Sequence, residues 1–431
     1  MLGKAARRRF GRRAGFRALQ AQVGIRNVTA GFSHATRPLV DRISVADATA
    51  WIDAHVAPLA AEAVALAHAA RRVLAQDAVA TAAVPPTDQA AIDGFALRAD
   101  ETAGASAYNP LSFRLAAAGR DEALAPGGAM LVSAGDLLPR GADAVVALEH
   151  VEPGPSGSGE VIDAAAAGHG VAPRGSSVMP GMTLLEAGRR LHPHDIGLLA
   201  TAGVTRVPVV RRPRVRCFVL ARTSARSGAP LADANGPLLR ALIDRDGGDA
   251  MEPGQIERDR AAIAQALRTA DADLVIIVGG TGRGADDHSA PALAEAGELA
   301  MHGLALNPGE TAGLGRSAAG VPVLLLPGAP AACLWAYELV AGRAIRRRAG
   351  RDPALPFHRR EMTTARKIVS AIGMTEIVPV RCLSEDRVEP ISSAPAAIAA
   401  AVRPDGFVII SEGSEGIPAG AVAAVHLYAA C

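Results

Sequence analysis

Aromatic residues are scarce in this chain: Phe, Trp and Tyr make up 3% of its 431 residues, although apolar residues make up 49%. The hydrophobic core must therefore be built mainly from Ala, Val, Leu and Ile. Cysteine is also rare, and Cys217, Cys333, Cys382 and Cys431 form no Cys-X-X-Cys pair. These absences argue against zinc sites, iron–sulfur clusters and a disulfide framework, and they fit a reducing cytoplasm.

Long apolar runs and three common motifs are missing too. No run approaches the roughly 18 apolar residues that span a membrane, so no membrane partner is expected. G-x-x-x-x-G-K-[ST] and G-x-S-x-G do not occur, and the glycine-rich segment lacks the spacing of a dinucleotide fingerprint. The absence of these motifs argues against a P-loop, a nucleophile-elbow hydrolase and a Rossmann-type dinucleotide site.

The net charge of +2 conceals an uneven distribution. Residues 1–40 hold nine of the 45 Lys and Arg residues and no Asp or Glu, which leaves 36 basic and 43 acidic residues in the rest. This segment can be interpreted as a nucleic-acid arm, a targeting peptide or a solvated tail. It lacks an apolar segment of about 7–15 residues behind its arginines. We therefore expect a disordered tail without export, no nucleic-acid partner and a cytoplasmic body.

Hydrophobic spacing changes along the rest of the chain. Residues 44–80 carry apolar positions at three- and four-residue spacing, which predicts helix in two pieces separated by Pro58. Residues 111–150 contain short apolar runs between Gly and Pro, which predict strands. From about residue 192 strands alternate with helices, and after Pro353 the pattern is strand-like again. Such alternation predicts a parallel sheet with helices on both faces.

The expected fold is a multidomain α/β protein that contains a doubly wound, mostly parallel sheet. We assign residues 84–169 to a β-rich domain, 196–352 to the α/β domain and 353–431 to a small C-terminal β domain. Residues 41–83 and 170–195 are expected to form an extended linker domain of helix and strand. A chain of this length is long enough for about two to four domains.

The stretch LVIIVGGTGRGADDHS, residues 274–289, places a buried-strand pattern before four glycines and two aspartates. Glycines let backbone N–H groups approach a ligand closely, and the N-terminus of a following helix favours an anion. The stretch alone indicates either a phosphate held with Mg²⁺ or a tight turn whose aspartates cap the helix. Ligands bind at the carboxyl ends of parallel strands. This loop and LPGAP at residues 326–330 are therefore expected to line one crevice.

Two other groups of polar residues are less informative. His192 and His194 flank Pro193, but residues two apart do not share a helix face, so a helix entrance capped by Asp195 is expected rather than a metal site. Asp93-Gly94 is ordinarily a turn, although the preceding Pro-Pro pair would hold its carboxylate in a fixed direction.

The order of seven short segments carries more information than any one of them. They are AAIDGFA, SAGDLLPRGADAVVALE, DIGLLATAG, DANGPLLRALIDRDGG, DLVIIVGGTGRGADD, NPGETAGLG and LPGAPAA. In this order they are similar to (S)AMDGYA, TGAPxPxGADAVVxxE, DIGLLAxxG, DxN…L…G, DxxxxxGGxSxGxxD, KPGKPxxxG and LPGNPxS. From about residue 41 onward the chain thus resembles the molybdopterin molybdenumtransferase family, the MoeA-type proteins that include the gephyrin E domain.

The resemblance implies an elongated homodimer of four-domain chains, with substrate bound between the molybdopterin-binding α/β domain of one subunit and the β-rich domain of the other. It implies insertion of molybdate into adenylylated molybdopterin with Mg²⁺ and release of AMP, and a client molybdoenzyme as partner. Asp93, Asp233 and Asp287 match the catalytic carboxylates, of which Asp233 and Asp287 would hold Mg²⁺. The implied substrate-binding residues are Gly279, Gly280, Gly282, Gly284, Asn235, Pro308, Gly309, Pro327, Gly328 and Pro330.

Departures from the family pattern fall on polar positions, whereas the Gly and Pro positions are kept. The replacements are Ala134 for a threonine, Arg222 and Thr223 for two acidic residues, Gly282 for a serine, Asn307 and Glu310 for two lysines, and Ala329 for an asparagine. Arg222, Arg283 and Arg316 are candidates to restore the lost positive charge. Two functions remain open: an insertase with a rebuilt pocket, or a degenerate paralogue that carries molybdopterin or the mature cofactor for a molybdoenzyme.

Overall fold

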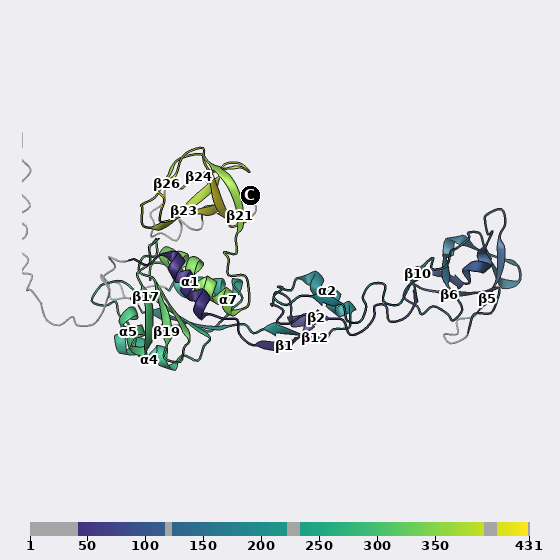
Figure 1. The fold of residues 1–431 in the computed structure, drawn as a ribbon, viewed down its shortest axis with the longest axis horizontal. Coiled ribbons are helices and arrows are strands. Elements are labelled where there is room, and N and C mark those ends of the chain that lie inside the picture. Colours follow the sequence, from purple (N-terminus) through teal and green to yellow (C-terminus); the bar gives the residue numbers. More distant parts are fainter. Residues whose placement is uncertain (1–41, 117–122, 222–232, 392–402, 430–431) are drawn as a thin grey trace, which may run out of the picture. The chain divides into compact units, whose positions relative to one another are not determined.

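The computed structural model describes residues 42–116, 123–221, 233–391 and 403–429 (Figure 1). These residues form a linker domain, a β-rich domain, an α/β domain and a C-terminal β domain, so the predicted multidomain α/β fold is confirmed. No helix in the described part of the chain is both long and apolar enough to cross a membrane.

Seven strands form the sheet of the α/β domain. Four neighbours run parallel, in the order β15 (Gly254–Ile256), β13 (Arg214–Leu220), β16 (Leu274–Val278) and β20 (Pro322–Leu326). The other three are β14 (Asp249–Ala250), parallel to β13, and the antiparallel β19 (Gly313–Ser317) and β17 (Gly297–His302). Because neighbouring parallel strands end at the same edge, the loops that follow β13, β15, β16 and β20 come together there.

Helices cover both faces of this sheet because the apolar side chains of β16 alternate between two cores. Leu274, Ile276 and Val278 face one core, and Val275 and Ile277 face the other. The first core is covered by α3 (Asn235–Arg245), α6 (Pro330–Ala336), the π-helical η5 (Tyr337–Ala341) and α7 (Gly342–Arg348). The second is covered by α4 (Arg260–Thr269) and α5 (Ser289–Ala296).

Helix α1 (Val45–His55) packs with the α/β domain, whereas the sequence places it in the linker domain. Its Ala48 and Ile52 are fully buried against α7 and η5. The carboxylate of Asp53 accepts two hydrogen bonds, 2.9 and 2.6 Å long, from Arg343 of α7. An amphipathic pattern shows that one face of a helix is buried but not which domain buries it, and this explains the difference.

Beyond Pro58 the prediction of a second helical piece is wrong. The chain extends into β1 (Ala61–Ala65), which pairs antiparallel with β12 (Arg206–Val210). Alanine-rich segments favour helix by propensity, but a distant strand here satisfies the backbone groups of β1 instead. The other linker elements are β2 (Ala78–Val79), β11 (Thr183–Leu185), α2 (Pro193–Thr201), and the pair β3 (Gln89–Ala90) and β10 (Val171–Ala172).

The α2 helix and β12 share the linker core with β1, so the α/β domain begins at β13 rather than at residue 196. At the start of α2, the carboxylate of Asp195 accepts the backbone N–H of His192 at 2.8 Å. The predicted capped helix entrance is therefore confirmed.

The β-rich domain is built on a six-stranded sheet in the order β7-β4-β6-β5-β9-β8. At the start of β4, a Cβ on Gly94 would lie 2.1 Å from the carbonyl oxygen of Val146, so only glycine fits beside Asp93. The strands are β4 (Gly94–Leu97), β5 (Leu111–Ala116), β6 (Gly128–Val132), β7 (Ala144–Ala147), β8 (Val151–Pro153) and β9 (Ser158–Val161).

The C-terminal domain is a closed ring of strands in the order β23-β24-β21-β27-β25, with β25 pairing back onto β23. The ring strands are β21 (His358–Thr364), β23 (Thr375–Cys382), β24 (Arg387–Pro390), β25 (Gly406–Ile410) and β27 (Val422–Leu427). Strand β18 (Leu306–Asn307), which ends at the first residue of the NPGE segment, pairs with β23 and so connects this ring to the α/β domain.

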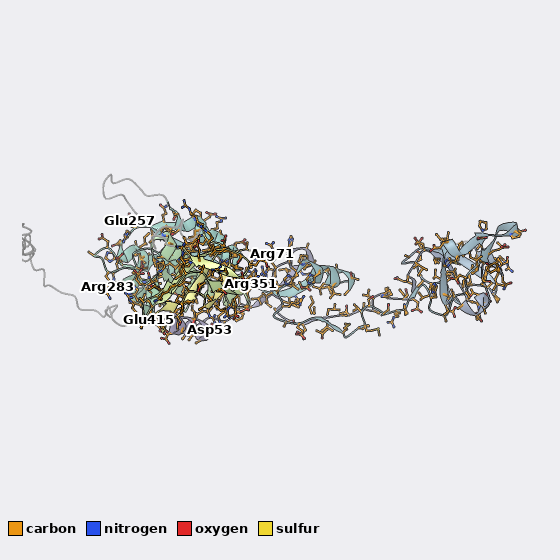
Figure 2. The ribbon with its side chains drawn as sticks, turned by 90° about the horizontal axis from the view of Figure 1, so that it is seen from above. Asp53, Arg71, Glu257, Arg283, Arg351 and Glu415 are labelled. Carbon is orange, nitrogen blue, oxygen red and sulfur yellow. The ribbon has the colours of Figure 1, made fainter. Side chains whose placement is uncertain are left out.

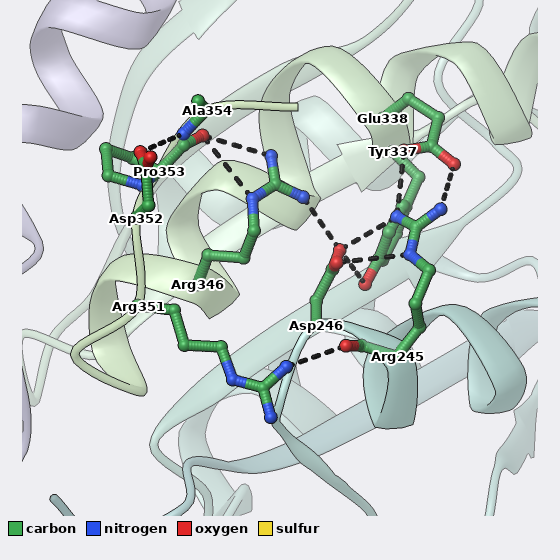
Figure 3. A network of polar contacts seen from close by, with 9 residues as sticks. All are labelled: Arg245, Asp246, Tyr337, Glu338, Arg346, Arg351, Asp352, Pro353 and Ala354. Atoms are coloured by element: carbon green, nitrogen blue, oxygen red, sulfur yellow. Dashed lines mark hydrogen bonds and ion pairs between the residues drawn. The ribbon is translucent and has the colours of Figure 1, made fainter. Parts of the chain in front are cut away.

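A buried polar network joins the end of α3 to the π-helical η5 and α7 (Figure 3). The side chain of Asp246 is fully buried and accepts hydrogen bonds from Arg245 at 3.0 Å, Arg346 at 2.9 Å and Tyr337 at 3.1 Å. Arg245 also donates to both oxygens of Glu338, at 2.7 and 2.8 Å. Burial raises the pKa of the Glu338 carboxyl, and Arg245 opposes this shift. Each charged side chain in the network is thus stabilised by a neighbour of opposite charge in place of water.

Replacing Asp246 with Ala is expected to lower the free energy of unfolding of the α/β domain by roughly 3–5 kcal/mol, because the buried Arg346 loses its ion-pair partner while Arg245 keeps its pair with Glu338. Urea unfolding followed by tryptophan fluorescence measures this directly. Both tryptophans, Trp51 and Trp335, pack into the core of this domain, so their emission reports on its unfolding.

Asp271→Ala is the matched control, because Asp271 is 86% exposed and pairs with Arg214 on the surface. Its cost should stay below about 1 kcal/mol. Equal losses in the two variants would show that the Asp246 network does not hold the domain together.

Candidate functional site

A cleft of about 310 Å³ lies at the carboxyl ends of the parallel strands. The glycine loop after β16 and the segment after β20 form opposite sides of it, as the position of both segments predicts. Its walls come from Arg258, Gly279, Gly280, Thr281, Gly282, Asp287, Glu310, Thr311, Pro327, Gly328, Ala329 and Ala332.

Two glycines allow the loops on either side of the cleft to touch. A Cβ on Gly328 would lie 3.3 Å from the Cα of Gly279, so the two backbones approach more closely than side chains permit. The N–H of Gly279 donates to the carbonyl of Leu326 at 2.9 Å and extends the strand pairing to the rim of the cleft. Asn235, buried at the start of α3, donates its side-chain N–H to the carbonyl of Gly328 at 3.1 Å.

The glycine loop returns to helix α5 through a left-handed residue. Gly280 has φ +61°, and a Cβ there would lie 2.5 Å from a methyl group of the buried Leu220. Ser289, the first residue of α5, donates its hydroxyl to the carbonyl of Gly279 at 2.7 Å and its N–H to that of Gly280 at 2.9 Å. Within the described residues, the N–H groups of Thr281 and Gly282 donate to no acceptor, so they are free to bind an anion.

Asp287 forms an ion pair across the loop. One carboxylate oxygen lies 3.0 Å from the guanidinium of Arg258, and the other accepts the backbone N–H of Gly284 at 2.8 Å. A Cβ on Gly282 would lie 2.5 Å from the second oxygen, so the lack of a side chain at this position makes room for the Asp287 carboxylate.

The NPGE segment supplies the remaining polar groups of the cleft. Glu310 is exposed and accepts the N–H of Gly309 at 3.1 Å. The hydroxyl groups of Thr311 and Thr281 lie 2.8 Å apart and link this segment to the glycine loop. Asn307 points away from the cleft residues and donates its side-chain amide to Glu376 of the C-terminal ring at 2.8 Å.

Comparisons with known proteins extend over most of the chain. It is 33% identical over 313 residues to molybdopterin molybdenumtransferase 2 of Mycobacterium tuberculosis, an alignment that covers 68% of this chain and 76% of that protein. The chain belongs to the molybdopterin molybdenumtransferase family. It is also 26% identical over 379 residues to a putative molybdopterin biosynthesis protein of Methanocaldococcus jannaschii, with 84% and 91% covered.

Three family models match consecutive parts of the chain, and two of them describe MoeA regions. The MoeA N-terminal region (domain I and II) matches residues 43–203, a probable molybdopterin binding domain matches 223–347, and the MoeA C-terminal region (domain IV) matches 361–428. The crystal structure of a MoeA protein from Pyrococcus horikoshii is 28% identical, with a TM-score of 0.76, and covers 90% of this chain and 99% of that one. The resemblance seen in the sequence is thereby confirmed.

Only part of the residue set carried over from the family motifs lines the cleft. Gly279, Gly280, Gly282, Asp287, Pro327 and Gly328 do so. Gly284, Asn235 and Gly309 do not line the cleft, but they form the hydrogen bonds to its lining residues that are described above. Pro308 and Pro330 are not among the lining residues either. Pro330 begins helix α6, where its missing N–H is of no consequence.

Asp233 and Asp93 lie outside the cleft lining. One oxygen of Asp233 accepts the backbone N–H groups of Asn235 and Gly236, both at 2.9 Å, and so stabilises the first turn of α3. Asp93 is exposed in the β-rich domain and accepts the N–H of Ala134 at 2.7 Å. Because this bond uses the backbone, the threonine-to-alanine difference at position 134 leaves it in place.

The described residues do not fit the Mg²⁺ site that MoeA membership suggests for Asp233 and Asp287. Both oxygens of Asp287 already have donors, and one donor is the positively charged Arg258. In the part of the chain that the structure describes, no three His, Cys, Asp or Glu side chains gather as a metal-binding group. Mg²⁺ needs oxygen ligands in near-octahedral geometry, and the chain here offers a carboxylate that is already neutralised.

The sequence analysis missed Arg258 and proposed three other arginines. Arg283 is exposed (Figure 2), Arg316 pairs with Glu298 outside the cleft lining, and Arg222, with Thr223, lies outside the described residues. A signal for Arg258 was present, because it follows β15 closely and the carboxyl ends of parallel strands line the site. The short strand β15 is not evident from hydrophobic spacing, so the sequence did not indicate that Arg258 follows a strand.

Replacing Gly280 with Ala is expected to displace Leu220 and Ser289 and to destabilise the α/β domain. Gly320→Ala is the control, since Gly320 also has a left-handed φ of +76° but nothing within 4 Å of its would-be Cβ. The control should cost about 1–2 kcal/mol for the backbone alone. Gly280→Ala should cost roughly 1–3 kcal/mol more, because of crowding. Urea unfolding of both variants measures the difference. Identical losses in the free energy of unfolding would show that the loop accommodates a Cβ at residue 280 without crowding.

Proposed function

We propose that this chain is a molybdopterin molybdenumtransferase that inserts molybdate into adenylylated molybdopterin and releases AMP, and so acts in molybdenum cofactor biosynthesis. The observation that carries the proposal is the cleft at the carboxyl ends of β13, β15, β16 and β20 in a member of this family. The relatives that bear the transferase name favour this function over that of a carrier for molybdopterin or mature cofactor.

The residues of the cleft suit recognition of a phosphate-bearing ligand. The free N–H groups of Thr281 and Gly282 donate to phosphate oxygens, and the hydroxyl pair of Thr281 and Thr311 adds the one O–H donor that the contact between them does not use. These groups are held by packed strands and need no rearrangement, so they stabilise charge that develops on phosphoryl oxygens as AMP leaves.

A second copy of this chain is proposed to complete the cleft with its Asp93. The support is the position of Asp93, exposed at the start of β4 and fixed by the N–H of Ala134, in a residue pattern that matches a family motif. A symmetric dimer would form two such composite sites, each with residues from both copies.

Incubation of the purified full chain with adenylylated molybdopterin and molybdate is expected to release AMP over many turnovers and to yield cofactor that reconstitutes an apo-molybdoenzyme. Asp287→Ala should lower the rate at least about 100-fold, the effect of losing one positioned donor, because Asp287 holds Arg258 and the N–H of Gly284 in place. Asp286→Ala, next to it on the same loop and outside the cleft lining, is the control and should retain the wild-type rate. Tight substrate binding without AMP release by the wild type would instead identify a carrier.

Mixing two inactive variants tests the composite site. In a dimer of Asp93→Asn with Asp287→Ala, one of the two sites combines the unchanged residue of each chain. Random exchange at equal amounts should therefore restore about a quarter of the wild-type rate. If Asp93 acted within its own chain, every site would carry a change and the mixture would stay inactive.

A further inference from the structure

We infer that Arg258, and not a divalent metal ion, neutralises Asp287 and binds the phosphate group of the ligand in this cleft. The inference rests on the proposed function for the identity of the ligand. It goes beyond the family pattern, because none of the motifs that identify the family includes this residue.

The charged residues that line the cleft indicate that Arg258 is the group that binds an anion. Two lining residues, Asp287 and Glu310, are acidic, and Glu310 stands where the family motif has a lysine. Among the described residues of the lining, Arg258 is the one basic side chain. Among the described residues of its walls, an anionic ligand that enters this cleft therefore meets one positive group, and that group already faces Asp287.

The contact between Arg258 and Asp287 leaves donors free. One terminal nitrogen of the guanidinium donates to Asp287 at 3.0 Å and to the carbonyl of Asp286 at 3.4 Å. The other terminal nitrogen donates to no acceptor within the described residues, and the buried Nε also has none. A guanidinium carries five N–H donors in a planar fork that matches phosphate oxygens. Arg258 thus has unused donors on a side chain that lines the cleft.

The local fold holds Arg258 at the cleft. It follows β15 by two residues, and its neighbour Asp259 caps helix α4 by accepting the N–H of Ala262 at 3.0 Å. The backbone on either side of Arg258 is therefore part of a strand end or a helix start. The side chain is 33% exposed, which leaves its end accessible to a ligand while its stem is packed.

The same geometry disfavours a metal ion at Asp287. A cation bound to this carboxylate would lie beside a guanidinium nitrogen that is 3.0 Å from the carboxylate oxygen, and the two positive charges would repel each other. Binding of metal at this oxygen would require Arg258 to move away from Asp287. Arg258 supplies the opposing charge without that change.

Calorimetric titration of AMP into the full chain tests the inference, in buffer with a chelator and in buffer with Mg²⁺. The wild type is expected to bind AMP in the chelator, with an affinity that Mg²⁺ changes less than about threefold. Arg258→Gln should weaken binding in the chelator by about 10–100-fold, the usual range for a lost hydrogen bond to a charged group, and Mg²⁺ should then strengthen it, because Asp287 is set free. Arg258→Lys keeps the charge and should fall between the two.

Arg260→Gln is the matched control, since Arg260 lies two residues away and pairs with Glu295 at 2.9 Å outside the cleft lining. It should bind AMP within about twofold of the wild type. Tryptophan fluorescence shows whether each variant is folded. If Arg258→Gln does not fold, the AMP affinity of Arg258→Lys is compared with that of the wild type instead.

Three results overturn the inference: wild-type binding that disappears in the chelator, absence of AMP binding in both buffers, or a folded Arg258→Gln variant that binds AMP like the wild type. The turnover assay separates this outcome from a failure of the proposed function. Metal-independent AMP binding that depends on Arg258, together with absent AMP release, would leave the inference standing and refute the transferase activity.

Discussion

The contact between Gly279 and Gly328 is the constraint on which the cleft depends. A Cβ on Gly328 would come within 3.3 Å of the Cα of Gly279, so the loops after β16 and β20 meet through their backbones. That approach allows Asn235 to hold the carbonyl of Gly328 and fixes the start of α3 at the same place. Three loops that are distant in sequence thus meet at this backbone contact and at the hydrogen bonds beside it.

Much of this arrangement could be predicted from the sequence, because it depends on features that short patterns record. The alternation of strands and helices indicates the parallel sheet, and the carboxyl-end rule places the glycine loop and the LPGAP segment on one cleft. What could not be predicted depends on partners that lie far away in the chain. Alanine-rich β1 is a strand only because β12 pairs with it, and α1 packs on α7 rather than in the linker. Arg258 was missed because β15 is too short to show a period.

The polar positions that differ from the family motifs have taken on structural roles where the structure describes them. Asn307 holds the C-terminal ring through Glu376, and Glu310 accepts the N–H of the neighbouring Gly309. Gly282 leaves room for the carboxylate of Asp287, which a serine Cβ would crowd at 2.5 Å. Positive charge at the cleft comes instead from Arg258, which approaches from a different strand.

These differences bear on whether a rebuilt cleft can still carry out the family reaction. The groups best suited to hold a phosphate are backbone N–H groups, and side-chain replacement does not remove them. Asp93 is likewise held by the backbone of residue 134, so the loss of a threonine hydroxyl there does not release it. Side-chain charges need only be balanced, and a fixed guanidinium balances a carboxylate as a metal ion does, although it cannot act as a Lewis acid. A transferase of this form would rely on positioned hydrogen bonds for most of its stabilisation of the leaving phosphate.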